Sequence, residues 1–435
     1  MTPTPSLAET TLSMPHTMGI QAKPAKANRT VPGAFHFIAG CKYFDVDTHD
    51  SAALDEACER MVSYEDHESL IGALERSEID IAMIAVDNNN SGRVVSAIEA
   101  LRGKNLQIIG KIAIAVDQHI LLPPDVAEEN VQQVISQKPA LVQAEPNLPQ
   151  HWVRLERSDT VGSAVEVSAT PDGKIEGKVT AAIASRMAGE TTGLTVGRKV
   201  SPEGNATTFW LVTTKPENYP DITAQTPTHA AFTFSTADAA GALLKVVGTF
   251  SKQGEGFNFT DIDCHLSPDD SEHPVFFAEV ALRNQQDVDN FHAITSNLAG
   301  EYALKVLGVF ADKTDQALHT AVSRPTNAEA SPIPQISWHG RDPSEGSSVI
   351  YVQSNGQPGS LEAMLTVFDA QAINITTMTR PIAPDDNGKR GFGFVVSPGV
   401  TIDAAVKALQ EQGYETNSYT YTNNKLLPSE PAGLS

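Results

Sequence analysis

Cationic residues are scarce in this chain of 435 residues: 31 Lys and Arg stand against 53 Asp and Glu, which gives a formal net charge of −22. No Lys/Arg-rich run offsets this excess, so neither nucleic acid nor an anionic membrane surface is an expected partner. If the ligand is itself an anion, local hydrogen-bond donors must capture it, because the overall field repels it.

Cysteines, long apolar runs and metal-type histidine spacings are also lacking. Cys41, Cys58 and Cys264 are too few and too scattered for a disulfide framework or a metal site. No apolar run approaches the roughly 20 residues of a membrane span. The 12 histidines show no HxH or HExxH spacing, so we expect neither a metal nor another cofactor.

The N-terminal segment 1–32 is rich in Thr, Pro, Ser, Ala and Lys and lacks the apolar core of a secretory signal. We expect a disordered leader, or a true start downstream at Met14 or Met18. Together with the small number of cysteines, this composition predicts a cytoplasmic protein.

Residues 33–214 alternate short apolar runs with helical patterns. The runs predict strands at 81–86, 106–109 and 209–212, and the spacing of apolar residues from Val94 to Leu101 predicts a helix. Such alternation is typical of an α/β fold with a largely parallel sheet. Three prolines within 215–227 indicate a linker.

The second half of the chain contains an internal repeat. Each copy reads strand, glycine-led turn, amphipathic helix and strand, and a second pair of elements follows. The pattern predicts two βαββαβ units, at 228–312 and 346–425, joined by a Ser/Pro-rich linker at 313–345. The recurring pairs are Gly241 and Gly359, Leu243 and Leu361, Phe250 and Phe368, Asn258 and Asn374, Thr260 and Thr376, and Ile262 and Met378.

Several motifs are dispersed through residues 33–425. They include Ala85 through Val94, His119 through Leu122, Ser136 through Gln143, Ala181 through Ser185, Asn205 through Phe209, and Ile373 through Pro381. Together these motifs resemble those of the prephenate dehydratase family, whose members join a catalytic domain to a regulatory ACT domain.

The resemblance implies a two-lobed, periplasmic-binding-protein-like α/β catalytic domain over 33–214, followed by two ferredoxin-like ACT domains. Prephenate would lie between the lobes. Thr207 would act as hydrogen-bond donor or acid, with Asn88 and Thr160 as the other catalytic residues. The residues expected to bind the substrate are Asp87, Asn89, Asn205, Thr208 and Phe209.

Two departures from the family pattern concern the same site. The glycine-rich opening motif, Gly-Pro-x-Gly-Thr-Phe-Ser, is not recognisable in residues 37–44. Thr208 replaces an arginine that would bind a substrate carboxylate in a bidentate manner. The candidate replacements are the cations Arg93, Lys111, Lys138 and Arg186.

Three functions follow from the resemblance and its departures. The first is a non-aromatising prephenate decarboxylase in a specialised, antibiotic-type amino-acid pathway, favoured by the altered site. The second is a prephenate dehydratase that makes phenylpyruvate for phenylalanine biosynthesis, favoured by the retention of Thr207 and Asn88. The third is an inactive regulator that senses an amino acid.

The ACT resemblance also predicts an amino-acid effector. Its binding residues would be Gly241, Ala242, Leu243 and Leu244 of the first copy and Arg380 and Pro381 of the second. Because ACT units commonly pair their sheets, a homo-oligomer is expected, although the tandem copies could pair within one chain.

Overall fold

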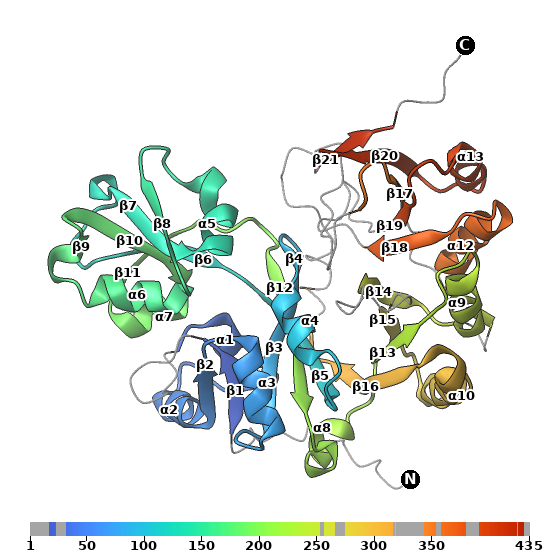
Figure 1. Ribbon diagram of the computed structural model, residues 1–435. Helices are drawn as coiled ribbons and strands as arrows, with labels where there is room; N and C mark the ends of the chain where they lie inside the picture. The colour runs from blue at the N-terminus through green and yellow to red at the C-terminus, as the bar shows by residue number, and fades with distance from the viewer. Residues whose placement is uncertain are drawn as a thin grey trace, which may run out of the picture.

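The computed structural model describes residues 17–22, 32–252, 256–265, 275–315, 318, 343–353, 358–379, 391–423 and 425–429. Within these ranges the strands form three sheets, of ten, six and five strands. Figure 1 shows two α/β lobes beside a pair of smaller α/β units. This arrangement confirms the predicted fold class, a two-lobed α/β domain followed by two ferredoxin-like units.

Lobe 1 consists of residues 17–22, 32–116 and 205–214, and helices cover both faces of its sheet. α1 and α2 pack on one face around Phe37, and α3 and α4 pack on the other around Leu70. Strands buried on both faces read as continuous apolar runs, as 81–86 does. The elements are α1 (Phe35–Tyr43), α2 (Ser51–Arg60), α3 (His67–Glu75), α4 (Val95–Leu101), β1 (Met18–Gln21), β2 (Met61–Tyr64), β3 (Ile81–Asn88), β4 (Gly92–Arg93), β5 (Gln107–Ala115) and β12 (Ala206–Thr213).

Lobe 2 consists of residues 118–200 and is inserted between β5 and β12. Its parallel strands β7, β10 and β8 lead directly or by a short turn into the helices α5, α7 and α6. The N-termini of these helices therefore share one edge of the sheet, which is where α/β folds bind ligands. The elements are β6 (Gln118–Leu122), β7 (Gln133–Gln137), α5 (Lys138–Ala144), β8 (Val153–Arg157), α6 (Thr160–Ser168), β9 (Lys174–Ile175), β10 (Lys178–Ser185), α7 (Arg186–Thr192) and β11 (Thr195–Lys199).

The sheets of both lobes are mixed, so the prediction of a largely parallel sheet is wrong. In lobe 1, β1 is parallel to β2 and β3, but β12 is antiparallel to both β3 and β5. The connection explains the difference. The chain leaves lobe 1 at the carboxyl end of β5 and returns from lobe 2 at the same edge, so β12 must run in the opposite direction.

The segment Met18–Gln21 is a strand at the interior of the lobe 1 sheet, between β2 and β3. Met18 and Ile20 are fully buried, so the prediction of a disordered leader is wrong for these residues. Four residues are too few to show a periodicity, and the burial that fixes this strand comes from its neighbours. The other residues expected in the leader, 1–16 and 23–31, lie outside the described ranges.

The first ACT-like unit has the predicted βαββαβ order and is called unit 1. It comprises β13 (His229–Ser235), α9 (Ala242–Lys252), β14 (Phe259–His265), β15 (Val275–Ala281), α10 (Gln285–Tyr302) and β16 (Lys305–Asp312). The linker before it contains the short helix α8 (Pro220–Thr223). β16 does more than close the unit, because it pairs in parallel with β5 and so joins the sheet of unit 1 to that of lobe 1.

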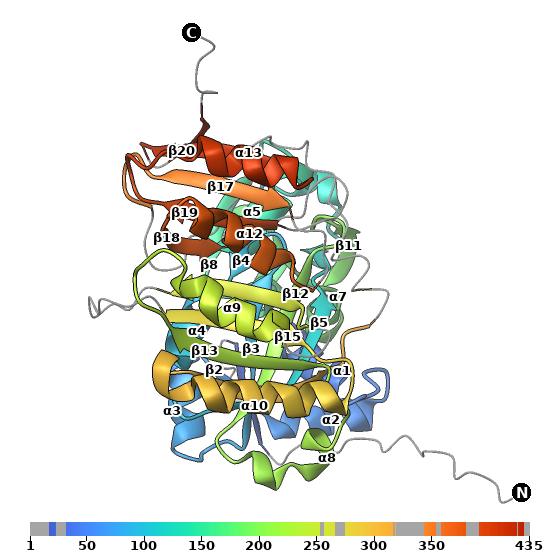
Figure 2. The same ribbon diagram turned by 90° about the vertical axis from the view of Figure 1, so that its right-hand side faces the viewer.

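The second ACT-like unit, unit 2, repeats this order and strand arrangement. It comprises β17 (Ser348–Gln353), α12 (Ser360–Ala370), β18 (Ile375–Thr379), β19 (Gly391–Val396), α13 (Asp403–Glu411) and β20 (Thr416–Thr422), with β21 (Lys425–Pro428) added at the outer edge. Units 1 and 2 pack on each other within the chain. α9 contacts α12, β14 contacts β18, and one apolar core extends through both units; Figure 2 shows the four helices side by side.

Candidate active site at the lobe junction

The side chain of Asn88 organises the turn between β3 and β4. Its Oδ1 accepts hydrogen bonds from the backbone N–H groups of Asn90 and Ser91, both at 2.9 Å, as in an Asx turn. Its Nδ2 donates to Oγ1 of Thr207 at 2.9 Å and to the carbonyl of Ala206 at 3.0 Å. Because antiparallel pairing sets Thr207 opposite Asn88, strand register brings together two of the three predicted catalytic residues.

The hydroxyl of Thr207 accepts a hydrogen bond from Asn88, which leaves its own proton available. A hydroxyl carries one O–H donor and two acceptor lone pairs, and the Asn88 amide uses one of those lone pairs. Thr207 is buried at the start of β12. The pair therefore presents an oriented hydroxyl donor, which is what protonation of or hydrogen bonding to a departing oxygen requires.

Carboxamides surround this pair. Asn205 accepts from Asn88 and Asn90 at 3.0 and 2.9 Å, and Asn89 binds the backbone of Gly204 and Ala206. Gln143, from α5 of lobe 2, donates to Asn88 at 3.3 Å and accepts from Asn205 at 3.0 Å. Gln143 was not among the predicted site residues, although it ends the motif that begins at Ser136, and it bridges the two lobes.

A second contact closes the junction from the other side. The Ser185 hydroxyl, which caps α7, donates to the carbonyl of Gly33 at 2.6 Å. Gly33 has φ +111°, and a Cβ there would lie 2.5 Å from the backbone nitrogen of Ala188. Glycine is therefore required in the turn that leads into α1.

His36, in the first turn of α1, lies beside β3 and β12 and is neutral. Its Nε2 accepts from the backbone N–H of Ala85 at 3.3 Å, and its ring meets the Phe209 ring edge-on at 5.0 Å. Burial, with a smaller effect of His67, lowers the pKa of His36 to about 3. An acceptor Nε2 leaves the proton of the neutral ring on Nδ1.

Thr160 lies at the first position of α6, across the junction in lobe 2. It is buried, and Asp159 caps the helix by accepting from Gly162 at 2.7 Å. No hydrogen bond among the described residues joins Thr160 to Asn88 or Thr207. Lys138 and Arg186 begin the neighbouring helices α5 and α7 at the same edge, and both are exposed.

Three predicted substrate-binding residues lie elsewhere in lobe 1. Phe209 is buried in the core under α1. Side chains alternate between the faces of a strand, so Thr208 shares the face of Trp210, which packs on Phe277 of unit 1. Asp87 pairs with Thr208 across the strands, and its charge helps to raise the pKa of Arg93. The described contacts thus bring Asn89 and Asn205 to the Asn88–Thr207 pair but not Asp87 or Thr208.

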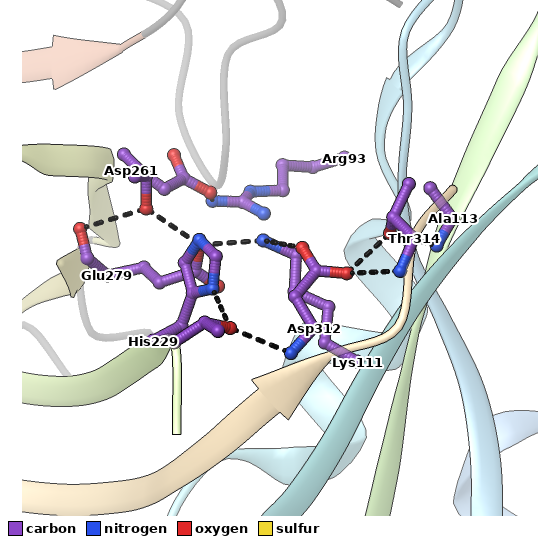
Figure 3. Close-up of polar contacts among 10 residues, drawn as sticks. Arg93, Lys111, Ala113, His229, Asp261, Glu279, Asp312 and Thr314 are labelled. Atoms are coloured by element: carbon purple, nitrogen blue, oxygen red, sulfur yellow. Dashed lines mark hydrogen bonds and ion pairs between the residues drawn. The ribbon is translucent and has the colours of Figure 1, made fainter. Parts of the chain in front are cut away.

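Two of the four candidate cations are committed to unit 1 (Figure 3). Arg93 is hydrogen-bonded to Asp261, and Lys111 binds Glu279 at 2.7 Å. Both are buried; burial lowers their pKa values, but the neighbouring carboxylates outweigh it and raise them. Both side chains therefore stay charged and serve the interface with unit 1. Lys138 and Arg186 are the two candidates that remain at the junction.

A second candidate site, for the effector, lies between units 1 and 2. A small cavity of about 20 Å³, partly open to solvent, is lined by Gly241, Leu243 and Leu244 of unit 1 and by Asn374 of unit 2. Gly241 has φ +75°, and a Cβ there would meet the Asp369 carboxylate at 2.3 Å. Ala242 begins α9 beside the cavity. Arg380 and Pro381, also predicted here, lie outside the described residues.

Two adjacent lobes with convergent helix N-termini, followed by a joined pair of ferredoxin-like units, define a two-lobed α/β domain with tandem ACT-like domains. No helix of the described part is long and apolar enough to cross a membrane. The family model for prephenate dehydratase matches residues 31–217. This region of the chain is therefore similar to the prephenate dehydratase family.

One curated protein is similar to part of the chain. Arogenate dehydratase/prephenate dehydratase 2, chloroplastic, of Arabidopsis thaliana is 30% identical over 108 residues, which cover 25% of this chain and 28% of that protein. The match therefore spans about a quarter of the relative's own length.

The structural neighbours share the fold. Prephenate dehydratase from Arthrobacter aurescens, in complex with L-Phe, has a TM-score of 0.52 and 19% identity, covering 68% of this chain and 90% of that one. The enzyme from Staphylococcus aureus has a TM-score of 0.50 and 18% identity, covering 68% and 100%. GqqA, described as a novel type of quorum-quenching acylase, has a TM-score of 0.52 and 19% identity, covering 69% and 99%.

Proposed function

We propose that this protein is a lyase that acts on prephenate with loss of CO2, and that it is a non-aromatising prephenate decarboxylase of a specialised, antibiotic-type pathway in the cytoplasm. The observation that carries the proposal is the Asn88–Thr207 pair at the junction of a domain that matches the prephenate dehydratase model, with no arginine bonded to the pair among the described residues. Thr208, which occupies the arginine position of the family motif in sequence, shares the face of Trp210 toward unit 1, and Arg93 and Lys111 are bound to unit 1.

The reaction requires the protein to position prephenate and to supply one hydrogen-bond donor. When the ring carboxylate leaves as CO2, the electron pair of the broken C–C bond enters the ring diene. In a decarboxylase this pair takes up a proton from a water molecule at another ring carbon, and the hydroxyl stays. In a dehydratase it expels the hydroxyl opposite, which must be protonated as it leaves. The Thr207 O–H can donate to that oxygen in both cases.

Prephenate is a dicarboxylate, so the site also needs groups that bind its two carboxylates. Lys138 and Arg186 stand at helix starts of lobe 2, where the backbone N–H groups and the helix dipole also favour anions. We propose that they bind the two carboxylates, with Thr160, Asn89 and Asn205 shaping the pocket. Binding of the overall negative substrate by local donors fits the net charge of −22.

The dehydratase is the second candidate. It is favoured by the retained Thr207 and by its Asn88 partner, because a hydroxyl that leaves as water needs such a donor. The third candidate, an inactive regulator, predicts a junction filled with apolar side chains. The carboxamides of Asn89, Asn205 and Gln143 around Thr207 argue against it.

Regulation by an amino acid at the cavity between units 1 and 2 is part of the proposal. Asp238 and Asp369 line this cavity together with apolar Leu243, Leu244 and Phe368. Carboxylates beside an apolar lining suit the ammonium group and the side chain of an apolar amino acid. Because the two units already pair within the chain, this site needs no second subunit, and the expected homo-oligomer remains a separate prediction.

The test is the product formed from prephenate by the purified protein at neutral pH, followed by ultraviolet absorption and mass. A non-aromatic product lighter than prephenate by CO2 alone supports the decarboxylase. Phenylpyruvate, which has lost CO2 and water, would establish the dehydratase instead. Prephenate that decays no faster than without protein would leave the regulator as the explanation.

A further inference from the structure

We propose that Arg93 is a positioning residue: by its bond to Asp261 of unit 1, it holds the β3–β4 turn, and through that turn Asn88 and Thr207, in the reactive arrangement. This inference rests on the proposed function. It adds β14 of unit 1, which carries Asp261, to the elements that position the active-site residues.

Arg93 is the closing residue of the turn that Asn88 opens. In the β3–β4 ladder Asn88 pairs with Gly92, and Asp87 pairs with Arg93. The backbone N–H groups of Asn90 and Ser91 within the turn bind Asn88 Oδ1. The backbone that orients Asn88 is thus fixed at one end by β3 and at the other by β4, a strand of only two residues. Asn89 and Asn90 tie the turn to residues 204–206, and the β4 end of the turn has a further anchor through Arg93.

Unit 1 supplies that anchor. The guanidinium of Arg93 is hydrogen-bonded to Asp261, lies 3.6 Å from the Asp263 carboxylate and sits 5.2 Å above the ring of Phe277. The Arg93 side chain is 6% exposed, so water does not compete for these contacts. A buried arginine has a planar fork of donors and holds its partners in one geometry, which a lysine cannot do. Figure 3 shows Arg93 reaching from lobe 1 toward Asp261.

The anchoring strand also borders unit 2. Asp261 and Asp263 belong to β14, which contacts β18 of unit 2, and the Cys264 side chain hydrogen-bonds to Thr377 of β18. One strand therefore carries contacts both to the β3–β4 turn and to the unit that forms the far wall of the effector cavity. Any shift of β14 relative to lobe 1 must move Arg93 or break its bond to Asp261.

Lys111 provides a matched control at the same interface. It too extends from lobe 1 and is buried against carboxylates of unit 1, Glu279 at 2.7 Å and Asp312 at 3.6 Å. It belongs to β5, however, and contacts no residue of the β3–β4 turn among those described. A mutation of Lys111 weakens the interface without releasing the turn, so it separates positioning from general stability.

The experiment compares Arg93→Gln, Asp261→Asn and Lys111→Met in the full chain, with steady-state kinetics on prephenate and hydrogen exchange of the Asn90 and Ser91 amides. We expect Arg93→Gln and Asp261→Asn to lower kcat about a hundredfold, as small misplacements of reacting groups do, with less change in KM. Both amides should exchange faster. The double variant should be no worse than either single one, because one contact is removed. Lys111→Met should keep kcat within about threefold and leave both amides protected.

Two results would overturn the inference. One is unchanged exchange of both amides in folded Arg93→Gln and Asp261→Asn. The other is an equal loss of kcat in Lys111→Met, which would make Arg93 merely one part of a stabilising interface. If the wild-type chain does not convert prephenate, the proposed function fails, and the exchange measurement still decides whether Arg93 holds the turn.

Discussion

Units 1 and 2 have the same fold, but their fourth strands have different neighbours. β16 of unit 1 pairs with β5 of lobe 1, and the interface behind it buries Arg93 and Lys111 among carboxylates. β20 of unit 2 pairs with β21 and touches no part of the catalytic lobes in the described sheets. Unit 2 is held instead through unit 1, by an apolar core and by the exposed pair of Lys252 and Glu362. One copy of the duplicated module thus extends the sheet of lobe 1, and the other copy packs on the first.

The largest effect on the free energy of unfolding is expected from the buried charges between lobe 1 and unit 1. Lys111→Met leaves Glu279 and Asp312 without their cation in a buried site, so we expect a loss of about 3–5 kcal/mol in the free energy of unfolding. Lys252→Met, at the boundary of units 1 and 2, removes an exposed charge and should cost no more than about 1 kcal/mol. Denaturant titration of both variants checks the difference; equal losses would mean that the two boundaries are alike.

The next largest loss of stability is expected at the backbone contact between β16 and β5. A Cβ at Gly308 would lie 2.1 Å from the carbonyl oxygen of Ile108, so Gly308→Ala should push the strands apart and cost about 1–3 kcal/mol. Gly300, in α10 of the same unit, has open space around it. Gly300→Ala is the control and should stabilise by up to about 1 kcal/mol through helix propensity. A tolerated Gly308→Ala would show that unit 1 is not fused to lobe 1 as described.

A further effect at the boundary between lobe 1 and unit 1 depends on pH. Burial raises the pKa of Asp263 well above its usual range; Arg93 lowers it, and Asp261 raises it further. Between its ordinary and its raised pKa the folded state binds a proton that the unfolded state releases, so this carboxyl lowers stability as pH rises. Asp263→Asn should therefore stabilise the protein near neutral pH, by up to about 1.4 kcal/mol per pH unit above 4, and have little effect at pH 4. The same gain at both pH values would contradict a protonated Asp263.

The repeat explains why the ACT-like half could be predicted from the sequence. Leu243, Val247 and Phe250 recur in kind as Leu361, Leu365 and Phe368, and all six are buried in the core that units 1 and 2 share. Periodicity of this sort reports burial directly. The Asn88 loop and Thr207 could be proposed from motifs alone, although their hydrogen bond depends on strand register, which no local pattern gives.

What the sequence could not supply are partners that are distant along the chain. Lys111 and Glu279 are 168 positions apart, as are Arg93 and Asp261, so nothing near Arg93 indicated that its charge was already neutralised by unit 1. Gln143 binds Asn88 from the other lobe for the same reason. The strand Met18–Gln21 was missed because a four-residue strand owes its burial entirely to its neighbours.

The central claim is that the Thr207 hydroxyl, oriented by Asn88, serves as the donor in the reaction on prephenate. The most direct test is the kcat of Thr207→Val, which keeps the shape of the side chain, beside that of Thr207→Ser, which keeps the hydroxyl. The account predicts a loss of about 10²–10³-fold in kcat for the valine variant and a much smaller loss for the serine variant, as for other positioned donors. A valine variant that turns over prephenate as fast as the serine variant would contradict it.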